Sequence, residues 1–108
     1  MRHYILDKFN HPIPCDDLIA FAEWMAEDHN RVVNRTILNE KVEVSTVFLG
    51  LDHNHDPEGR GDPILFETMV FGGKEDGLQR RYRTKAEAEV GHMMVVAELR
   101  RFTLLEVD

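Results

Sequence analysis

The alternation of apolar and polar residues divides the chain into segments with strand-like or helix-like spacing. Residues 2–7, "RHYILD", are partly β-branched or aromatic and are followed by the breaker cluster "NHPIP", so we expect a first strand there. From Asp16 the apolar residues recur at the spacing of one helical face, at Leu18, Phe21, Ala22 and Met25. Aspartates suit the positive end of a helix, and the pattern predicts a helix over residues 16–28.

The middle of the chain has the composition of paired strands. Residues 31–52 are dominated by β-branched side chains and are interrupted by the polar residues 39–41, which predicts a hairpin. The stretch "PILFETMVFGG", residues 63–73, predicts another strand that ends at paired glycines. After a glycine-rich turn, "LQRRYR" at residues 78–83 fits a shorter edge strand. These segments together predict an antiparallel sheet.

A second helix is predicted from Thr84, where "TKAE" places a hydroxyl at the first position and Glu87 three residues later. An apolar stripe follows and carries the helix to about Arg101; it consists of Ala88, His92, Val95 and Leu99. Gly91 beside this stripe permits a close approach to the sheet. We expect residues 102–108 to form a tail or a short added strand.

These elements predict one compact α+β domain over residues 1–108, because a chain of 108 residues rarely supports two independent cores. The expected fold is an antiparallel sheet of four to five strands with two helices packed on one face. The expected element order is β-α-β-β-β-(β)-α. An exposed strand edge in such a sheet would allow a homodimer.

Charge and cysteine content limit the partners and the compartment. Thirteen basic and twenty acidic side chains give a net charge of −7, which disfavours nucleic acid and makes a basic partner electrostatically easier. The acids are mixed with Arg and Lys along the chain, which also fits an ordinary solubilising surface. Cys15 is the single cysteine, and the start of the chain lacks a long apolar signal segment. No apolar run approaches the roughly 20 residues that span a bilayer, so we expect a cytoplasmic protein without a membrane role.

The loop between the predicted strands carries candidate metal ligands. Asp52, His53, His55 and Asp56 offer oxygen and nitrogen atoms within five residues, at the ends of two paired strands. The spacing matches no defined metal motif, and the same residue types build turns for geometric reasons alone. A divalent metal site and a polar hairpin tip are therefore both open interpretations.

Glu67 lies at the centre of the apolar strand "LFETMVF", where a buried carboxylate needs a partner. On the outer face of the sheet it would belong to a contact patch; on the inner face it would require His92 or an arginine. His92 belongs to the apolar stripe of the second helix, where it is either a hydrogen-bonded structural residue or a ligand. A helix covering the inner face could bring Glu67, His53 and His92 together, and with Asp52 they form the candidate metal set.

A small basic cluster is the other candidate binding site. "QRRYRT" groups Arg80, Arg81 and Arg83 around Tyr82, a combination that suits phosphate contacts and base stacking. The same arginines could simply protect an edge strand from aggregation. Trp24 lies off the centre of its helical face, so it either closes the edge of the core or contacts a partner.

Three segments, "VEVSTVFLGLDHN", "PILFETMVFGG" and "RYRTKAEAEVGH", resemble a family of small proteins often encoded in bacteriophage and prophage genomes. The resemblance covers most of the chain from Pro12 to about His92. The family has no assigned activity, so the resemblance implies a genomic context and no mechanism. Its members carry a shorter, glycine-rich tip where this chain has "HDPEGRGDP". The positions that match the family include Asp52, His53, Glu67 and His92.

The leading functional expectation is a non-enzymatic, phage-type accessory protein that binds a host or phage protein and thereby modulates a host process or a defence system. The chain has no Walker A loop, GxGxxG or GxSxG motif, and the segment "IPCDDL" around Cys15 contains no histidine, so no catalytic residue is assigned. The alternative is a small metal-dependent enzyme or ligand-binding domain. Its site would be Asp52, His53, Glu67 and His92. Nucleic-acid binding through residues 80–83 is the third interpretation.

Overall fold

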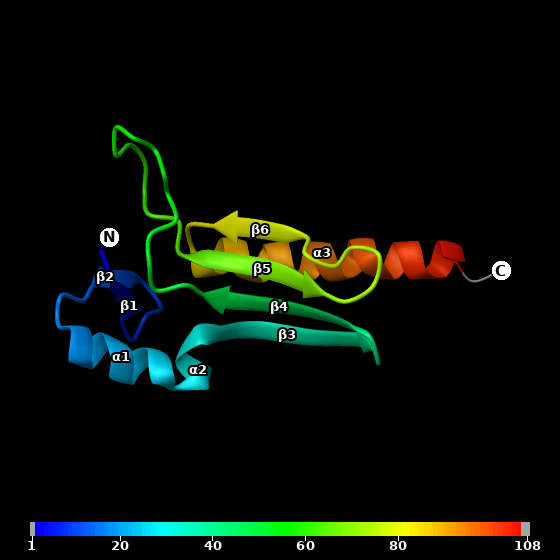
Figure 1. The fold of residues 1–108 in the computed structure, drawn as a ribbon, viewed down its shortest axis with the longest axis horizontal. Helices are drawn as coiled ribbons and strands as arrows, with labels where there is room; N and C mark the ends of the chain where they lie inside the picture. Colours follow the sequence, from blue (N-terminus) through cyan, green and yellow to red (C-terminus); the bar gives the residue numbers. More distant parts are fainter. Residues whose placement is uncertain (1, 107–108) are drawn as a thin grey trace.

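A four-stranded antiparallel sheet and a long helix form the centre of the protein in a computed structural model that describes residues 2–106. The strands lie side by side in sequence order and are β3 (Val32–Asn39), β4 (Val42–Phe48), β5 (Phe66–Phe71) and β6 (Gln79–Tyr82). Helix α3 (Lys85–Glu106) runs along one face of this sheet (Figure 1). The predicted α+β class, the antiparallel pairing and the edge position of the last strand are confirmed.

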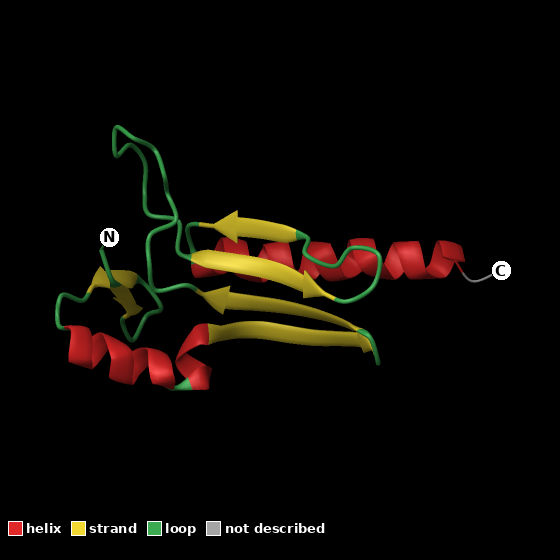
Figure 2. Cartoon of the chain, in the orientation of Figure 1, coloured by secondary structure: helices red, strands yellow, loops and turns green. Residues whose placement is uncertain are grey.

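The N-terminal segment forms a small sheet of its own (Figure 2). Strand β1 (Tyr4–Leu6) pairs with β2 (Pro12–Pro14), a segment whose prolines had indicated only a break. The amide of Tyr4 donates to the carbonyl of Gly50 at 2.8 Å, which joins the small sheet to the end of β4. Helices α1 (Leu18–Ala26) and α2 (Asp28–Arg31) lead from there into β3.

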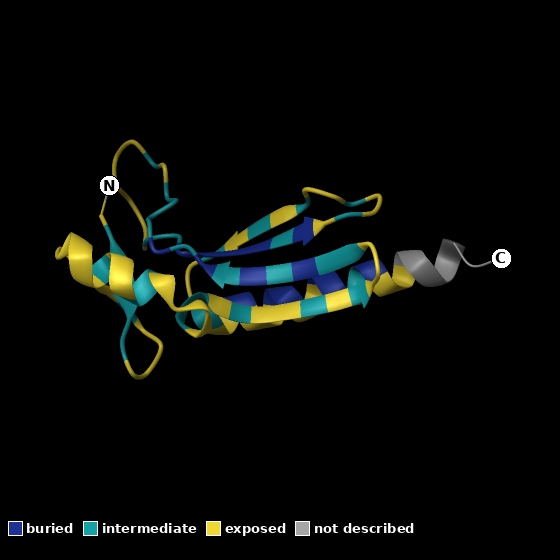
Figure 3. Ribbon diagram, turned by 60° about the horizontal axis from the view of Figure 1, so that its bottom comes forward, coloured by how far each residue is buried: buried dark blue, intermediate teal, exposed yellow. Residues whose placement is uncertain are grey.

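The main core lies between α3 and the inner face of the sheet, which we define as the face toward α3 (Figure 3). Successive side chains on a strand point to opposite faces, so every second residue of β4 and β5 is buried here. The strands contribute Val44, Thr46, Phe48, Phe66, Thr68 and Val70, and the helix contributes Ala88, His92, Val95, Val96 and Leu99. The predicted stripe of α3 is therefore the face that packs on the sheet.

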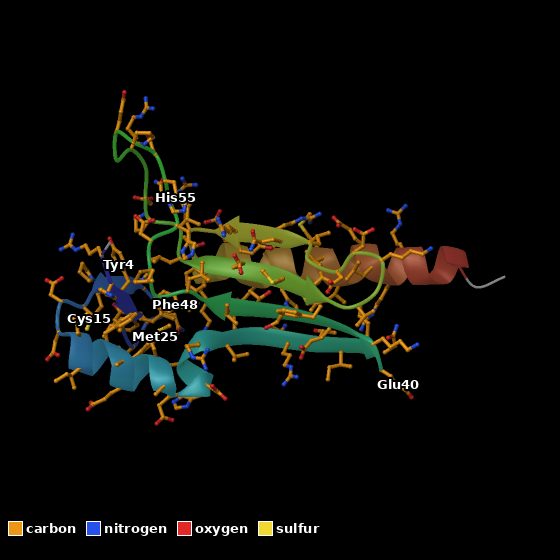
Figure 4. All side chains as sticks on the ribbon, viewed as in Figure 1. Tyr4, Cys15, Met25, Glu40, Phe48 and His55 are labelled. Carbon is orange, nitrogen blue, oxygen red and sulfur yellow. The ribbon has the colours of Figure 1, made fainter. Side chains whose placement is uncertain are left out.

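Helix α1 begins where the carboxylate of Asp17 accepts hydrogen bonds from the amides of Ile19 and Ala20. Its contact with the core runs through Trp24, whose ring lies edge-on to Phe48 at 5.5 Å. Met25 packs against the same cluster as Phe48 (Figure 4), and Phe21 is also partly buried. The predicted buried face was partly wrong, because Leu18 is 62% exposed and Ala22 is also exposed. The first turn of α1 lies beyond the end of the main sheet (Figure 1), and Leu18 in this turn stays exposed.

The N-terminus of α3 has the predicted cap. The hydroxyl of Thr84 accepts from the amide of Glu87 at 3.1 Å and donates to its carboxylate at 2.9 Å. Gly91 faces Tyr82, and a Cβ at this position would lie 2.2 Å from the phenol ring. The helix continues to Glu106 instead of ending near Arg101, since residues 102–106 contain no glycine or proline to stop it. Residues 107–108 lie outside the described part of the chain.

No helix within residues 2–106 has the length and apolar character needed to cross a membrane. The longest of these helices, α3, carries charged residues among apolar ones on its exposed side.

Candidate functional site

Asp52 closes the base of the loop that joins β4 to β5. Its carboxylate accepts hydrogen bonds from the amides of Asn54 at 2.7 Å and Ile64 at 2.9 Å. The amide of His53 donates to the carbonyl of Ile64 at 2.8 Å, and the ring Nδ1 of His53 lies 2.8 Å from the carbonyl of Leu51. Asp52 Oδ1 and the backbone amide of His53 thus hold the two ends of the loop together, while the His53 ring contacts the backbone on its own side of the loop.

The loop projects away from the sheet, and His55 lies on its lower part, below the tip (Figure 4). The side-chain amide of Asn54 donates to the carbonyls of Arg60 at 2.8 Å and Asp62 at 3.2 Å, which braces the loop from inside. The Arg60 guanidinium donates to Asp56 at 2.9 Å and holds the pKa of that carboxyl below its usual range. The polar residues of the loop thus shape its turns, as one of the two sequence interpretations had it.

His92 is fully buried between α3 and the sheet. Its Nε2 lies 2.8 Å from the hydroxyl of Thr36 on β3, and its Nδ1 lies 2.7 Å from the hydroxyl of Thr46 on β4. Burial lowers the pKa of His92, because the charged imidazolium would lose its hydration there. Burial thus favours the neutral ring, and both of its nitrogens have a threonine hydroxyl within hydrogen-bond distance.

The hydrogen bonds continue across the sheet to its other edge. The hydroxyls of Thr46 and Thr68 lie 2.5 Å apart, and the hydroxyl of Tyr82 donates to Thr68 at 3.1 Å. This buried polar network, defined as Thr36, Thr46, Thr68, Tyr82 and His92, joins all four strands of the main sheet to α3. Because each group in it has a partner, it stabilises one arrangement of the core, as satisfied buried networks do.

Glu67 lies on the opposite, outer face of the sheet, since it alternates with the inward-facing Phe66 and Thr68. It pairs across the strands with Arg81, whose Nε donates to its carboxylate at 3.0 Å. Glu67 is only 9% exposed, so this ion pair is partly shielded from water. The sequence had suggested His92 or an arginine as the partner of Glu67, and in the structure the partner is Arg81. Glu67 and His92 are separated by the sheet itself.

The four predicted metal ligands are thus distributed over three places: Asp52 and His53 at the loop base, Glu67 on the outer face and His92 in the core. Within the described residues, no group of three or more histidine, cysteine, aspartate or glutamate side chains is placed to hold a metal ion. The sequence does not reveal which face of the sheet α3 covers. For this reason it allowed Glu67 and His92 to be placed in one site.

The basic cluster around Tyr82 is also divided between the two faces. Arg80 makes two hydrogen bonds of 3.2 and 2.8 Å to Glu98 of α3, which joins the edge strand to the helix. Arg81 is paired with Glu67, and Arg83 donates to the carbonyl of Asp62 at 3.1 Å. Because each guanidinium is engaged in holding the fold, the cluster does not present one continuous basic surface.

A polar cleft of about 280 Å³ lies between the turn of the small sheet, α1 and the start of α3. Asp7, Lys8, Trp24, His29 and Lys85 are among the residues that line it. It is no larger than the smallest pockets that hold small ligands, at roughly 300 Å³. None of the four predicted metal ligands contributes to it.

The outer face of the sheet carries exposed apolar residues; the sequence had suggested a contact patch on the face of Glu67 without naming Ile37. Ile37 on β3 and Phe71 on β5 are 65% and 47% exposed. Both pair with Glu43 of β4, so the three side chains form one row across the sheet. A shallow depression of about 350 Å³ lies beside this row, at the end where β3 turns into β4. The β-branched and aromatic residues that signalled strands gave no sign of which face remains open.

Comparison with known proteins adds no relative. No protein-family model, curated protein or solved structure matches the chain. The surface of the chain itself is therefore the basis for inferring its function.

Proposed function

We propose that the chain is a non-enzymatic accessory module that binds a partner protein on the outer sheet face, which we define as Arg35, Ile37, Glu43, Met69 and Phe71. The observation that carries the proposal is the row formed by Ile37 and Phe71 on either side of Glu43. No helix within residues 2–106 packs over this row. Neighbouring exposed apolar side chains on a regular element are typical of a protein contact surface.

The surroundings of the row have the layout of an interface. Arg35 is ion-paired with Glu43, and the partly buried Met69 lies in the next cross-strand row. The exposed Ile37 and Phe71 thus flank the Arg35–Glu43 ion pair, so the face combines apolar and charged groups, as protein contact surfaces do. The depression beside Phe71 offers a place for a side chain of the partner.

Charge supports a partner with a basic surface. The net charge of −7 attracts a positively charged protein and speeds the encounter at low salt. The resemblance to phage-encoded proteins suggests that this partner is a host or phage protein in the host cytoplasm. Modulation of a host process or of a defence system is the role that such binding would serve.

The experiment captures partners from host lysate with the tagged protein, identifies them and measures binding with purified components. We expect the double variant Ile37→Ser, Phe71→Ser to bind the identified partner roughly 10- to 100-fold more weakly, because it removes the apolar centre of the interface. Binding of the wild type should also weaken as salt is raised.

The matched control is Leu18→Ser, Ile19→Ser, which changes two exposed apolar residues on α1, 62% and 73% exposed, away from the sheet. Both variants should unfold at the same temperature as the wild type. A partner that binds the sheet-face variant as tightly as the wild type would overturn the assignment of this face.

A further inference from the structure

Helix α3 has a second apolar stripe on the side that faces away from the sheet. We define this outer stripe as Ala86, Val90, Met93, Met94 and Ala97, all of which are exposed. Val90, Met93 and Met94 are 61%, 61% and 54% exposed, and the stripe borders a shallow depression of about 420 Å³. The buried stripe of the same helix lies opposite, so α3 is apolar on two faces. A solvent-facing helix surface of this kind is typical of a contact with another helix.

We propose that the outer stripe packs against the outer stripe of a second copy of this chain, with the two α3 helices antiparallel about a twofold axis between Met93 and Met94. The residues at 86, 90, 93 and 97 follow spacings of four, three and four, the pattern that places side chains along the seam between two helices. Such a seam favours a shallow crossing angle of about 20°.

The sizes of the side chains suit this register. With the axis between Met93 and Met94, Met93 faces the partner's Met94 and Val90 faces the partner's Ala97. The small Ala97 leaves room for the branched Val90, while the two flexible methionines can fill the centre of the contact. A register shifted by a turn would place Met93 against Ala97 of the partner subunit and leave the remaining methionine without a partner.

Charges beside the stripe select the antiparallel orientation. Glu87 and Glu89 lie in the N-terminal half of α3, and Arg100 and Arg101 lie in its C-terminal half. On a helical wheel Glu89 and Arg100 border one edge of the stripe, and Glu87 and Arg101 border the other. Antiparallel packing brings each acid beside an arginine of the second copy, whereas parallel packing would bring acid to acid.

The helix dipoles favour the same orientation, since antiparallel packing places the positive end of each α3 beside the negative end of the other. Glu98 is excluded from these contacts because it is already paired with Arg80 of its own chain. The dimer is independent of the proposed function: α3 lies on the inner side of the sheet, so both outer sheet faces remain free on opposite sides of the pair. One dimer could then bind two partner molecules.

The contact is small. The outer stripe spans twelve residues of α3, from 86 to 97, or about 18 Å at 1.5 Å per residue. A single helix pair of this length falls below the usual interface size of about 1,600 Å², which corresponds to a reversible dimer. Sedimentation equilibrium over a range of concentrations from roughly 1 to 500 µM covers the affinities expected of weak, transient contacts.

The first arm of the test compares Met93→Lys, Met94→Lys with Leu18→Lys, Ile19→Lys, two pairs of similarly exposed residues on different helices. We expect the methionine variant to dimerise at least about 100-fold more weakly than the wild type, since four apolar side chains leave the twofold centre. The control should dimerise like the wild type. A monomeric wild type over the whole range, or a dimer indifferent to the methionine changes, would contradict the proposal.

The second arm tests orientation with charge reversal. Glu89→Arg and Arg100→Glu should each weaken self-association about ten-fold, because each creates like-charge neighbours across the dimer. Mixed in equal amounts, the two variants should form a heterodimer with all pairs opposite in sign, at close to wild-type affinity. If mixing restores nothing, the antiparallel register is wrong, whatever the outcome of the first arm.

Discussion

On the inner face of the sheet the polar side chains are neutral and bonded to one another; on the outer face they are charged and border exposed apolar residues. The inner network extends from Thr36 through His92 to Tyr82, and each polar group in it has a hydrogen-bond partner. The outer face holds the Glu67–Arg81 pair and, nearby, the exposed row of Ile37 and Phe71. The inner polar groups thus stabilise the packing of α3 on the sheet, and the exposed apolar groups of the outer face mark the surface available to a partner. The predictions below test this contrast from the inner face outward.

The largest effect is expected from His92→Ala. The change leaves a cavity and removes the shared partner of Thr36 and Thr46, so the free energy of unfolding should fall by about 3 to 4 kcal/mol. Urea denaturation measures the change. His55→Ala in the projecting loop is the control and should stay within about 0.5 kcal/mol of the wild type. A small loss for His92→Ala would mean that the network is not part of the stable core.

Gly91→Ala should cost about 2 kcal/mol, although alanine is normally the better helix former. The new Cβ would lie 2.2 Å from the ring of Tyr82, so the ring or the helix must move. Glu23→Ala, at an exposed position of α1, controls for helix propensity. Combining Gly91→Ala with Tyr82→Leu should recover part of the loss, because the smaller side chain makes room. An unchanged midpoint for Gly91→Ala would contradict the close packing.

The pH dependence of stability should show the buried imidazole. Burial lowers the pKa of His92 below its ordinary value of 6.5. Above pH 6.5 the contribution of His92 to the free energy of unfolding is fully present. As the pH falls below 6.5, His92 takes up a proton more readily in the unfolded chain than in the folded one. Stability should therefore drop by up to about 1.4 kcal/mol per pH unit until the folded-state pKa is reached. Denaturation of His92→Gln between pH 7 and 5 should give a flatter profile, and equal slopes would refute the assignment.

The smallest effect is expected on the outer face, from the Glu67–Arg81 pair. Arg81 is about one-third exposed and solvent screens the pair, so a double-mutant cycle with Glu67→Gln and Arg81→Met should give a coupling of about 1 kcal/mol. Arg35 and Glu43, with the more exposed arginine of the two pairs, should couple by less. A coupling energy between Glu67 and Arg81 larger than the loss of unfolding free energy caused by His92→Ala would reverse the proposed contrast between the two faces.

Local signals in the sequence predicted much of the fold. The hydroxyl of Thr84 with Glu87, and the polar break between two β-branched runs, depend on neighbouring residues and were located correctly. The pairing of β1 with β2 was missed because it depends on contacts outside the segment, such as the amide of Cys15 donating to His3. Helix α3 extends past its predicted end for lack of a breaker.

The candidate site was harder to predict, because strand alternation defines two faces without telling which one a helix covers. That ambiguity allowed Glu67 and His92 to be placed together, although the sheet separates them. Thr46 and Thr68 read as ordinary strand residues, and only the pairing of β4 with β5 turns them into part of a network. The helical spacing of the outer stripe of α3 is also present in the sequence. From the sequence, only the buried stripe was identified as the apolar face of this helix.

The most direct test of the proposed docking face is methyl NMR during titration with the identified partner. The methyl signals of Ile37 and Met69 should change their chemical shifts as the partner binds the outer face, while those of Val44 and Val70 beneath α3 should stay unchanged. Shifts confined to the loop at residues 53–63, or to the outer stripe of α3, would contradict the claim that the partner docks on the open face of the sheet.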